Sequence, residues 1–192
     1  MKPLAHHALA TVAASLIGLP GWASGLPPEL RVAMPAAALS GQATLRFWGF
    51  EVYQASLWVA PGFSASRYFD HGFALELAYL RDFSGADIAR RSLAEMERQT
   101  QISAEQARRW GDQMGALFPD VKAGERLTGI HRPGAGARFL HNGRVVGEIA
   151  DPEFARLFFG IWLSAHTSEP KLRLALLQQL TPAAGAALAI TP

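Results

Sequence analysis

The sequence predicts an α+β fold, in which a long antiparallel sheet carries a layer of helices on one face. Three observations predict this class. Residues 45–80 show strand patterns, residues 84–117 change to a helical period, and strand patterns return from residue 124 before two further helical segments. Strands and helices that are grouped along the chain favour an antiparallel sheet with helices packed against it.

The first strands are expected within residues 45–59, LRFWGFEVYQASLWV. Aromatic and β-branched residues of this kind suit a pleated, half-buried surface. Gly49 divides the segment into two runs and predicts a bulge or a tight bend. A third strand is expected at residues 73–80, FALELAYL, where apolar side chains alternate. We expect this strand to bury one of its two faces.

Two helices are expected next, and each has a start signal. Ser84 with Asp87 opens the first, and Ser103 with Gln106 opens the second in the same way. Apolar residues recur at helical spacing on one side of each helix. Pro119 follows the end of the second. These helices need an apolar partner, and the sheet is the obvious one.

The strands that return from Gly124 contain the strongest short-range hairpin signal of the chain, Asn142-Gly143 between alternating residues. Asp151 then stands as a helix cap before Pro152, and the broad apolar stripe that follows predicts a mostly buried helix. A last helix is expected from Pro170. Residues 181–192 are small and low in complexity, and we expect a flexible tail there.

The N-terminal residues 1–23 resemble a secretory signal peptide. Lys2 precedes an apolar core at residues 8–19, and the small-residue segment WASG follows. The core is shorter than the ~20 apolar residues of a membrane span. A membrane anchor or a buried first helix is the alternative. We expect cleavage after Ala23, a periplasmic or secreted product without a transmembrane span, and one domain over residues 26–180.

Composition excludes several classes of function. Without Lys2, 17 of the 18 Lys and Arg residues remain against 16 Asp and Glu, and the two signs are interspersed. A nucleic-acid-binding surface needs clustered basic residues, so we expect no nucleic-acid partner. Cysteine is absent, which excludes disulfides, thiolate catalysis and cysteine metal sites.

The common enzymatic motifs are also missing. The segment PGAGAR at residues 133–138 lacks the third glycine and the following helix of a dinucleotide loop, so it predicts a turn. No serine lies in a G-x-S-x-G motif. The histidines of the expected domain lack the spacing of a helical metal site: His71, His131, His141 and His166. We therefore expect neither a metal nor a cofactor.

Arg46 is unusual because it lies within an apolar, aromatic run. One interpretation is that it occupies the exposed face of a half-buried strand. The other is that it is a charge held inside the protein for a ligand. The residues alone do not separate the two.

Three segments, RFWGFEVYQASLWV, LAYLRDFS and HNGRVVGEIADPEFARLFFGIWLS, resemble the chalcone isomerase-like superfamily, and its exported bacterial branch in particular. The resemblance covers residues 26–180. It implies an open-faced β-sandwich, with a ligand cleft between the sheet and the helices. The superfamily contains plant enzymes that cyclise chalcones without a cofactor, plastid relatives that bind fatty acids, and bacterial members of unknown role.

The resemblance also implies site residues. In the enzymes and the fatty-acid binders an early-strand arginine points into the cleft, and Arg46 matches it, with donors suited to a carboxylate. Tyr53 lies near a strand threonine of the enzymes, although it could instead be a core tyrosine. The tyrosine and asparagine that hold the enzymes' substrate correspond here to Ile88 and Glu95, with Arg91 between them. Isoleucine donates no hydrogen bond.

Three hypotheses result. The first is an exported, non-catalytic monomer that binds a fatty acid or a similar amphipathic carboxylate through Arg46, Tyr53 and Arg91. The alternative is a cofactor-free isomerase, an intramolecular lyase, that uses Arg46 and Tyr53. The third is an interaction module whose cleft is filled by its own aromatic side chains.

Overall fold

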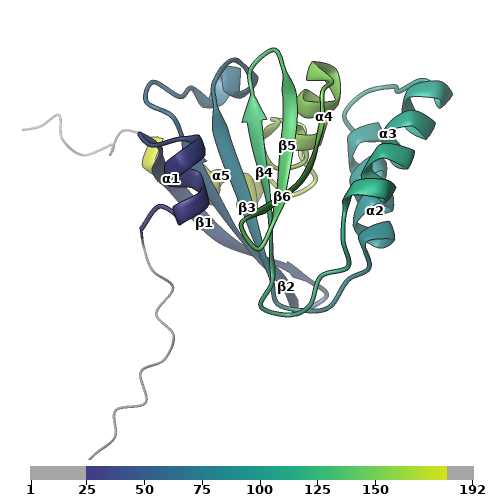
Figure 1. Cartoon of the computed structure of the whole chain (residues 1–192), viewed down its shortest axis with the longest axis horizontal. Helices are drawn as coiled ribbons and strands as arrows, with labels where there is room; N and C mark the ends of the chain where they lie inside the picture. The colour runs from purple at the N-terminus through teal and green to yellow at the C-terminus, as the bar shows by residue number, and fades with distance from the viewer. Residues whose placement is uncertain (1–24, 181–192) are drawn as a thin grey trace, which may run out of the picture.

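A computed structural model describes residues 25–180 (Figure 1). The expected signal peptide, residues 1–23, and the expected flexible tail, residues 181–192, lie outside the described residues. Both remain predictions.

The described chain contains a six-stranded antiparallel sheet in which neighbours in sequence are neighbours in space. Each strand is joined to the next by antiparallel pairing, which confirms the predicted class. The strands are β1 (Ala38–Phe47), β2 (Phe50–Val59), β3 (Phe73–Tyr79), β4 (Arg126–Arg132), β5 (Gly136–His141) and β6 (Arg144–Ile149).

Three helices cover one face of this sheet: α2 (Gly85–Glu97), α3 (Ala104–Leu117) and α4 (Pro152–Leu163) (Figure 1). Their starts agree with the predicted signals. Ser84 caps α2, Ser103 and Gln106 form a reciprocal capping box on α3, and Asp151 caps α4. As predicted, α4 is mostly buried. Within residues 25–180 no helix combines the length and the apolar character of a membrane span.

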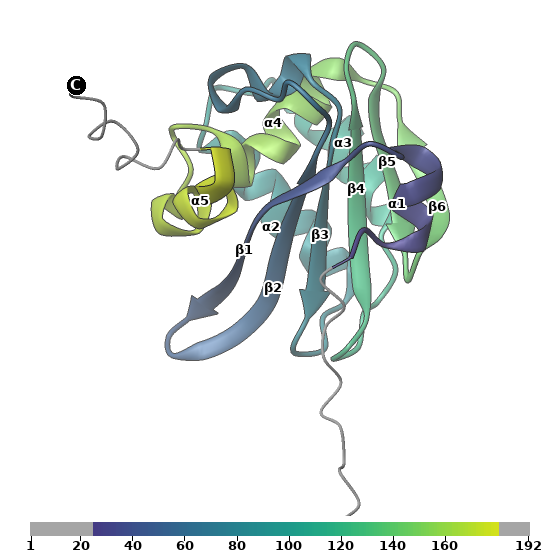
Figure 2. The same cartoon turned by 90° about the vertical axis from the view of Figure 1, so that its left-hand side faces the viewer.

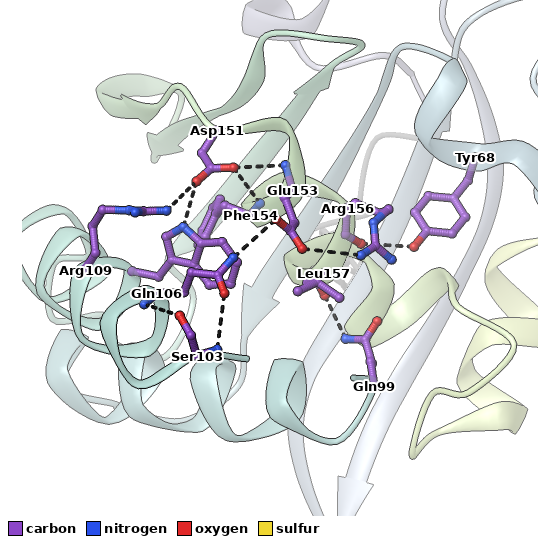
Figure 3. Close-up of polar contacts among 11 residues, drawn as sticks. Tyr68, Gln99, Ser103, Gln106, Arg109, Asp151, Glu153, Phe154, Arg156 and Leu157 are labelled. Carbon is purple, nitrogen blue, oxygen red and sulfur yellow. Dashed lines mark hydrogen bonds and ion pairs between the residues drawn. The ribbon is translucent and has the colours of Figure 1, made fainter. Parts of the chain in front are cut away.

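The α3–α4 junction is held by the carboxylate of Asp151 (Figure 3). It accepts hydrogen bonds from the backbone N–H groups of Glu153 and Phe154 at the start of α4. It also accepts from Nε1 of the fully buried Trp110 on α3, at 2.9 Å, and from Arg109 at 3.1 Å. One side chain therefore caps one helix and satisfies a buried donor of another.

The opposite face of the sheet is covered by a short helix, α1 (Pro28–Ala33), which the sequence analysis did not predict (Figure 2). Leu30 of α1 packs in an apolar cluster with residues of four strands: Trp58, Ala74, Ile130 and Leu140. The prediction that residues 73–80 bury one face is wrong, because every residue of β3 is buried. Even Glu76 lies inside, paired with Arg126 at 2.9 Å.

The first strand is longer than expected, since β1 begins at Ala38 and not at Leu45. Apart from Leu39, its added residues, ALSGQAT, are small or polar and show no run of large β-branched or aromatic side chains. Tertiary contacts hold this edge: α5 (Pro170–Leu176) packs against it, and the Ser40 hydroxyl donates to the carbonyl of Leu176 at 2.9 Å. Two short 3₁₀ segments, Ala65–Asp70 and Gln178–Leu180, complete the described chain.

Gly49 forms a tight bend, the second of the two possibilities considered. Trp48 and Gly49 connect β1 to β2 with positive φ angles of 50° and 82°. The predicted Asn142-Gly143 hairpin connects β5 to β6 with φ angles of 48° and 80°. Both are two-residue turns of the kind that suits the twist of antiparallel strands.

Candidate functional site

A cavity of about 800 Å³ lies between the helices and the β1–β3 part of the sheet. This volume falls within the ~300–1,000 Å³ of small-molecule sites. Most of the lining is apolar or aromatic, including Leu45, Val52, Leu77, Tyr79, Ile88, Leu127, Phe158, Ile161 and Trp162. The cleft that the family resemblance implied is therefore present, and its own aromatic side chains do not fill it.

The helix arrangement explains why this space is open. At the other end of the sheet α3 contacts β6 and α4 contacts β5. Helix α2 instead packs mainly on α3 and α4. It spans the β1–β3 region without closing onto it, and Ile88, Arg91, Ser92 and Glu95 of α2 form one wall of the cavity.

Tyr53 on β2 presents its hydroxyl to the cavity. Trp162 Nε1 donates a hydrogen bond to this oxygen at 2.9 Å. No residue among 25–180 accepts the hydroxyl's own proton. Burial raises the pKa of Tyr53 above its ordinary value, and the Trp162 hydrogen bond opposes this only in part. Tyr53 is therefore a neutral donor at physiological pH.

Tyr79 lies beside Tyr53, with ring centroids 5.9 Å apart in an edge-on arrangement. Burial, and then the neighbouring Tyr53, raises the pKa of Tyr79 as well. Both rings line the cavity. Two neutral phenols thus project from adjacent strands toward the same space.

Charged groups gather at the α2 wall near Tyr53. Arg91 pairs with Glu95 at 2.7 Å, and the Ser168 hydroxyl donates to the other oxygen of Glu95 at 2.8 Å. Arg98 approaches that oxygen at 3.6 Å. Glu169, Arg91 and Glu95 also line the cavity, and their charges act on the pKa of Tyr53. The cavity therefore has a polar region within an apolar lining.

Arg46 does not belong to this lining. Its guanidinium pairs with Glu51 across the hairpin at 2.6 Å, and its side chain is 67% exposed. Strand alternation is the reason: Leu45 and Phe47 face the cavity, so the residue between them faces away. The structure thus brings Tyr53 and Arg91 together and leaves Arg46 outside. Ligand binding by any of the three remains a prediction.

Other residues of the cavity lining were not predicted from the sequence. Trp162, the partner of Tyr53, lies 109 positions away, and no local pattern could have paired them. Arg81 also lies at the cavity, with its guanidinium 4.9 Å from the ring centroid of Phe50. The neighbouring Asp82 instead accepts hydrogen bonds from Lys122 and from the backbone N–H of Ala123.

Comparison with known proteins agrees with this architecture. The crystal structure of the Arabidopsis thaliana fatty-acid binding protein AtFAP1 is similar with a TM-score of 0.59 and 11% sequence identity. The match covers 74% of this chain and 87% of that one. At this identity the likeness concerns the fold.

A curated relative also matches the sequence. An uncharacterized protein of Haemophilus influenzae is 28% identical over 131 residues, which are 68% of this chain and 63% of the relative. The alignment thus spans less than two thirds of that relative's own length. A family model described as chalcone isomerase-like matches residues 23–178. The chain belongs to the chalcone isomerase-like family.

Proposed function

We propose that this protein binds a fatty acid or a similar amphipathic carboxylate in its cavity and catalyses no reaction on it. The observation that carries the proposal is the cavity itself: about 800 Å³ of mostly apolar lining, with a neutral phenol and a guanidinium on facing elements. An acyl chain suits the apolar lining, and the two polar groups suit a carboxylate.

Arg91 is the better candidate for the carboxylate anchor. An arginine has five N–H donors in a planar fork, and the bond to Glu95 uses only part of them. Ser168 and Arg98 also hold Glu95, so its charge stays compensated while Arg91 engages a ligand. The Tyr53 hydroxyl supplies a second donor to the same carboxylate. Arg46, facing away, supplies none.

The fold of the Arabidopsis fatty-acid binding protein supports a lipid-like ligand. That protein shares the fold at 11% identity, so the inference concerns the type of cavity and not individual contacts. The isomerase alternative would need Arg46 and Tyr53 at one site. Arg46 lies outside the cavity lining, and Ile88 gives the α2 wall no donor at its position.

The test compares dodecanoate with dodecanol, which has the same chain without the charge. We expect Arg91→Gln to weaken dodecanoate binding about ten-fold, because a hydrogen bond to a charged group is worth ~1.5–3 kcal/mol and exposure reduces it. Dodecanol binding should stay unchanged. Isothermal titration calorimetry measures both affinities, and thermal unfolding checks the fold.

Arg108→Gln is the matched control. Arg108 is 73% exposed and pairs with Asp112 four residues later on α3, as Arg91, 69% exposed, pairs with Glu95 on α2. It lies outside the cavity lining. Equal affinity of the wild type for acid and alcohol would exclude a carboxylate anchor. A loss with Arg46→Gln but not with Arg91→Gln would return the anchor to Arg46.

We also propose export to the periplasm or the medium, on the sequence of residues 1–23. Cell fractionation followed by N-terminal sequencing tests it, with a first residue near 24 as the expected result. A membrane-bound product that begins at Met1 would contradict the proposal. Native mass spectrometry of the gently purified exported protein would also reveal a co-purifying lipid.

A further inference from the structure

The β1–β2 turn exposes three large aromatic side chains. Trp48 is 87% exposed, Phe50 61% and Phe47 55%. The rings of Phe47 and Trp48 stack with centroids 5.8 Å apart. All three residues also line the mouth of the cavity. We call Phe47, Trp48 and Phe50 the aromatic tip.

The backbone conformation at Trp48 is unfavourable for a tryptophan. Its φ of 50° lies in the left-handed region, where a bulky residue is an outlier and Asn or Gly is preferred. The chain uses Asn142 at the equivalent position of its other two-residue turn. A tryptophan kept at a strained and solvent-exposed position makes no evident contribution to stability, and an outlier of this kind points to a function.

A basic side chain lies against the aromatic tip. Arg81 stacks over Phe50 and has no carboxylate partner among residues 25–180. Three nearby acidic groups each have a basic partner: Glu51 pairs with Arg46, Asp82 with Lys122 and Asp87 with Arg90. Two more, Asp120 and Glu125 on the α3–β4 connection, act on the same Lys122. The β1–β2 turn lies at the same end of the molecule as the β3–α2 and α3–β4 connections that carry several of these groups (Figure 1). The aromatic tip therefore has one basic side chain, Arg81, directly against it that no carboxylate of residues 25–180 pairs with.

We propose that the aromatic tip docks the protein on the surface of a lipid bilayer that contains anionic phospholipids. Tryptophan favours the interface between headgroups and acyl chains, and basic residues beside it are attracted to anionic headgroups. A two-residue turn with its flanking rings is too small for the ~800 Å² per partner that a stable protein interface buries. Docking places the cavity mouth against the bilayer. The proposal goes beyond the proposed function and does not depend on which ligand the cavity holds.

The test measures co-sedimentation of the full chain with vesicles of phosphatidylcholine alone or mixed with an equal amount of phosphatidylglycerol. We expect binding to the mixed vesicles that weakens with added salt. Trp48→Asn should weaken it about ten-fold or more, because a large aromatic surface then stays in water. Arg81→Gln should weaken it about five-fold, the equivalent of ~1 kcal/mol for one basic side chain near an anionic surface.

Three further measurements keep the test specific. Val32→Asn removes an apolar side chain of the same 87% exposure on α1, on the opposite face of the sheet, and should leave binding unchanged. Lipids brominated along their acyl chains should quench wild-type fluorescence, and Trp48→Phe should remove most of that quenching. Trp48→Asn should melt no lower than the wild type, because Asn accepts this backbone angle.

No binding by the wild type, or equal binding by Trp48→Asn, would overturn the proposal. So would a dimer in sedimentation velocity that Trp48→Asn abolishes while vesicle binding is absent, because the tip would then serve a second copy of the chain. Vesicle binding and the oligomeric state are both measured without dodecanoate. Membrane docking can therefore be disproved while dodecanoate binding is confirmed, and dodecanoate binding can be disproved while membrane docking is confirmed.

Discussion

The two hairpin turns at Trp48-Gly49 and Asn142-Gly143 have almost the same backbone and different chemistry. Asn142 accepts a hydrogen bond from the backbone N–H of Arg126 at 2.8 Å and donates to Glu125 at 3.0 Å. It therefore ties its turn to the start of β4. Trp48 makes no hydrogen bond with its side chain among residues 25–180 and stands in solvent.

The two turns also belong to parts of the sheet that are packed differently. The β4–β6 half of the sheet is packed by α3 and α4, and its polar side chains such as Asp151 are used to hold elements together. The β1–β3 half faces the cavity, and the Tyr53 hydroxyl there has no acceptor for its proton among residues 25–180. One half of the sheet is thus packed against helices, and the other leaves a donor open toward a cavity. Substitutions in each half can test this division.

The largest effect is expected from Asp151→Ala in the packed half. The change removes the cap of α4 and leaves the buried Trp110 N–H without its acceptor. We expect a loss of about 2–4 kcal/mol in the free energy of unfolding, measured by urea denaturation. Asp112→Ala is the control, since its carboxylate is 72% exposed and its one ion-pair partner within the described chain is Arg108. If both variants lost the same free energy of unfolding, the Asp151 contacts between α3 and α4 would not be a main source of stability.

Acid should weaken the same junction. Burial raises the pKa of Asp151, but hydrogen bonds from Phe154, Trp110, Glu153 and Arg109 outweigh it, so the pKa lies below the ordinary 3.8. The unfolded chain then binds more protons than the folded one, and the stabilisation is present above pH ~3.8 and is lost as the pH falls below it.

Asp151→Asn, which keeps the cap without the titrating charge, should flatten this decline between about pH 5 and pH 3. Urea denaturation at each pH measures it. An identical decline in variant and wild type would assign the acid sensitivity to other groups.

The two turns should respond in opposite ways to substitution. Asn142→Ala should cost about 1–2 kcal/mol in the free energy of unfolding, because it loses two hydrogen bonds and places alanine at a positive φ. Trp48→Asn should change it by less than about 0.5 kcal/mol or stabilise the protein. Urea denaturation compares them directly. A clear destabilisation by Trp48→Asn would mean that the tryptophan serves the fold, and the contrast between the halves would fail.

The smallest effect is expected in catalysis. Purified protein should not accelerate chalcone cyclisation, because Ile88 cannot hold the substrate's polar groups and Arg46 lies outside the cavity lining. An absorbance assay against the uncatalysed reaction measures the rate. A rate orders of magnitude above that background would favour the isomerase alternative and give the open half of the molecule a catalytic role.

The sequence by itself determined the features that depend on near neighbours. The helix caps at Ser84, Ser103 and Asp151 and the Asn142-Gly143 hairpin follow from interactions over two or three residues, so their patterns were sufficient. The alternation of apolar residues likewise located most strands. The number and order of these elements then limited the fold to a small set, and the predicted class was correct.

Tertiary structure alone decided which side chains meet. The cover over the second face of β3 comes from α1, whose contacts reach residues far along the chain, so Glu76 is buried where alternation predicted exposure. The cavity exists because α2 rests on other helices and stands off the strands. Tyr53 bonds to Trp162 and shares the cavity with Arg91, while Arg46 turns outward, because strand direction and helix placement set these positions. A local pattern carries no information on such distances, which only the packed chain defines.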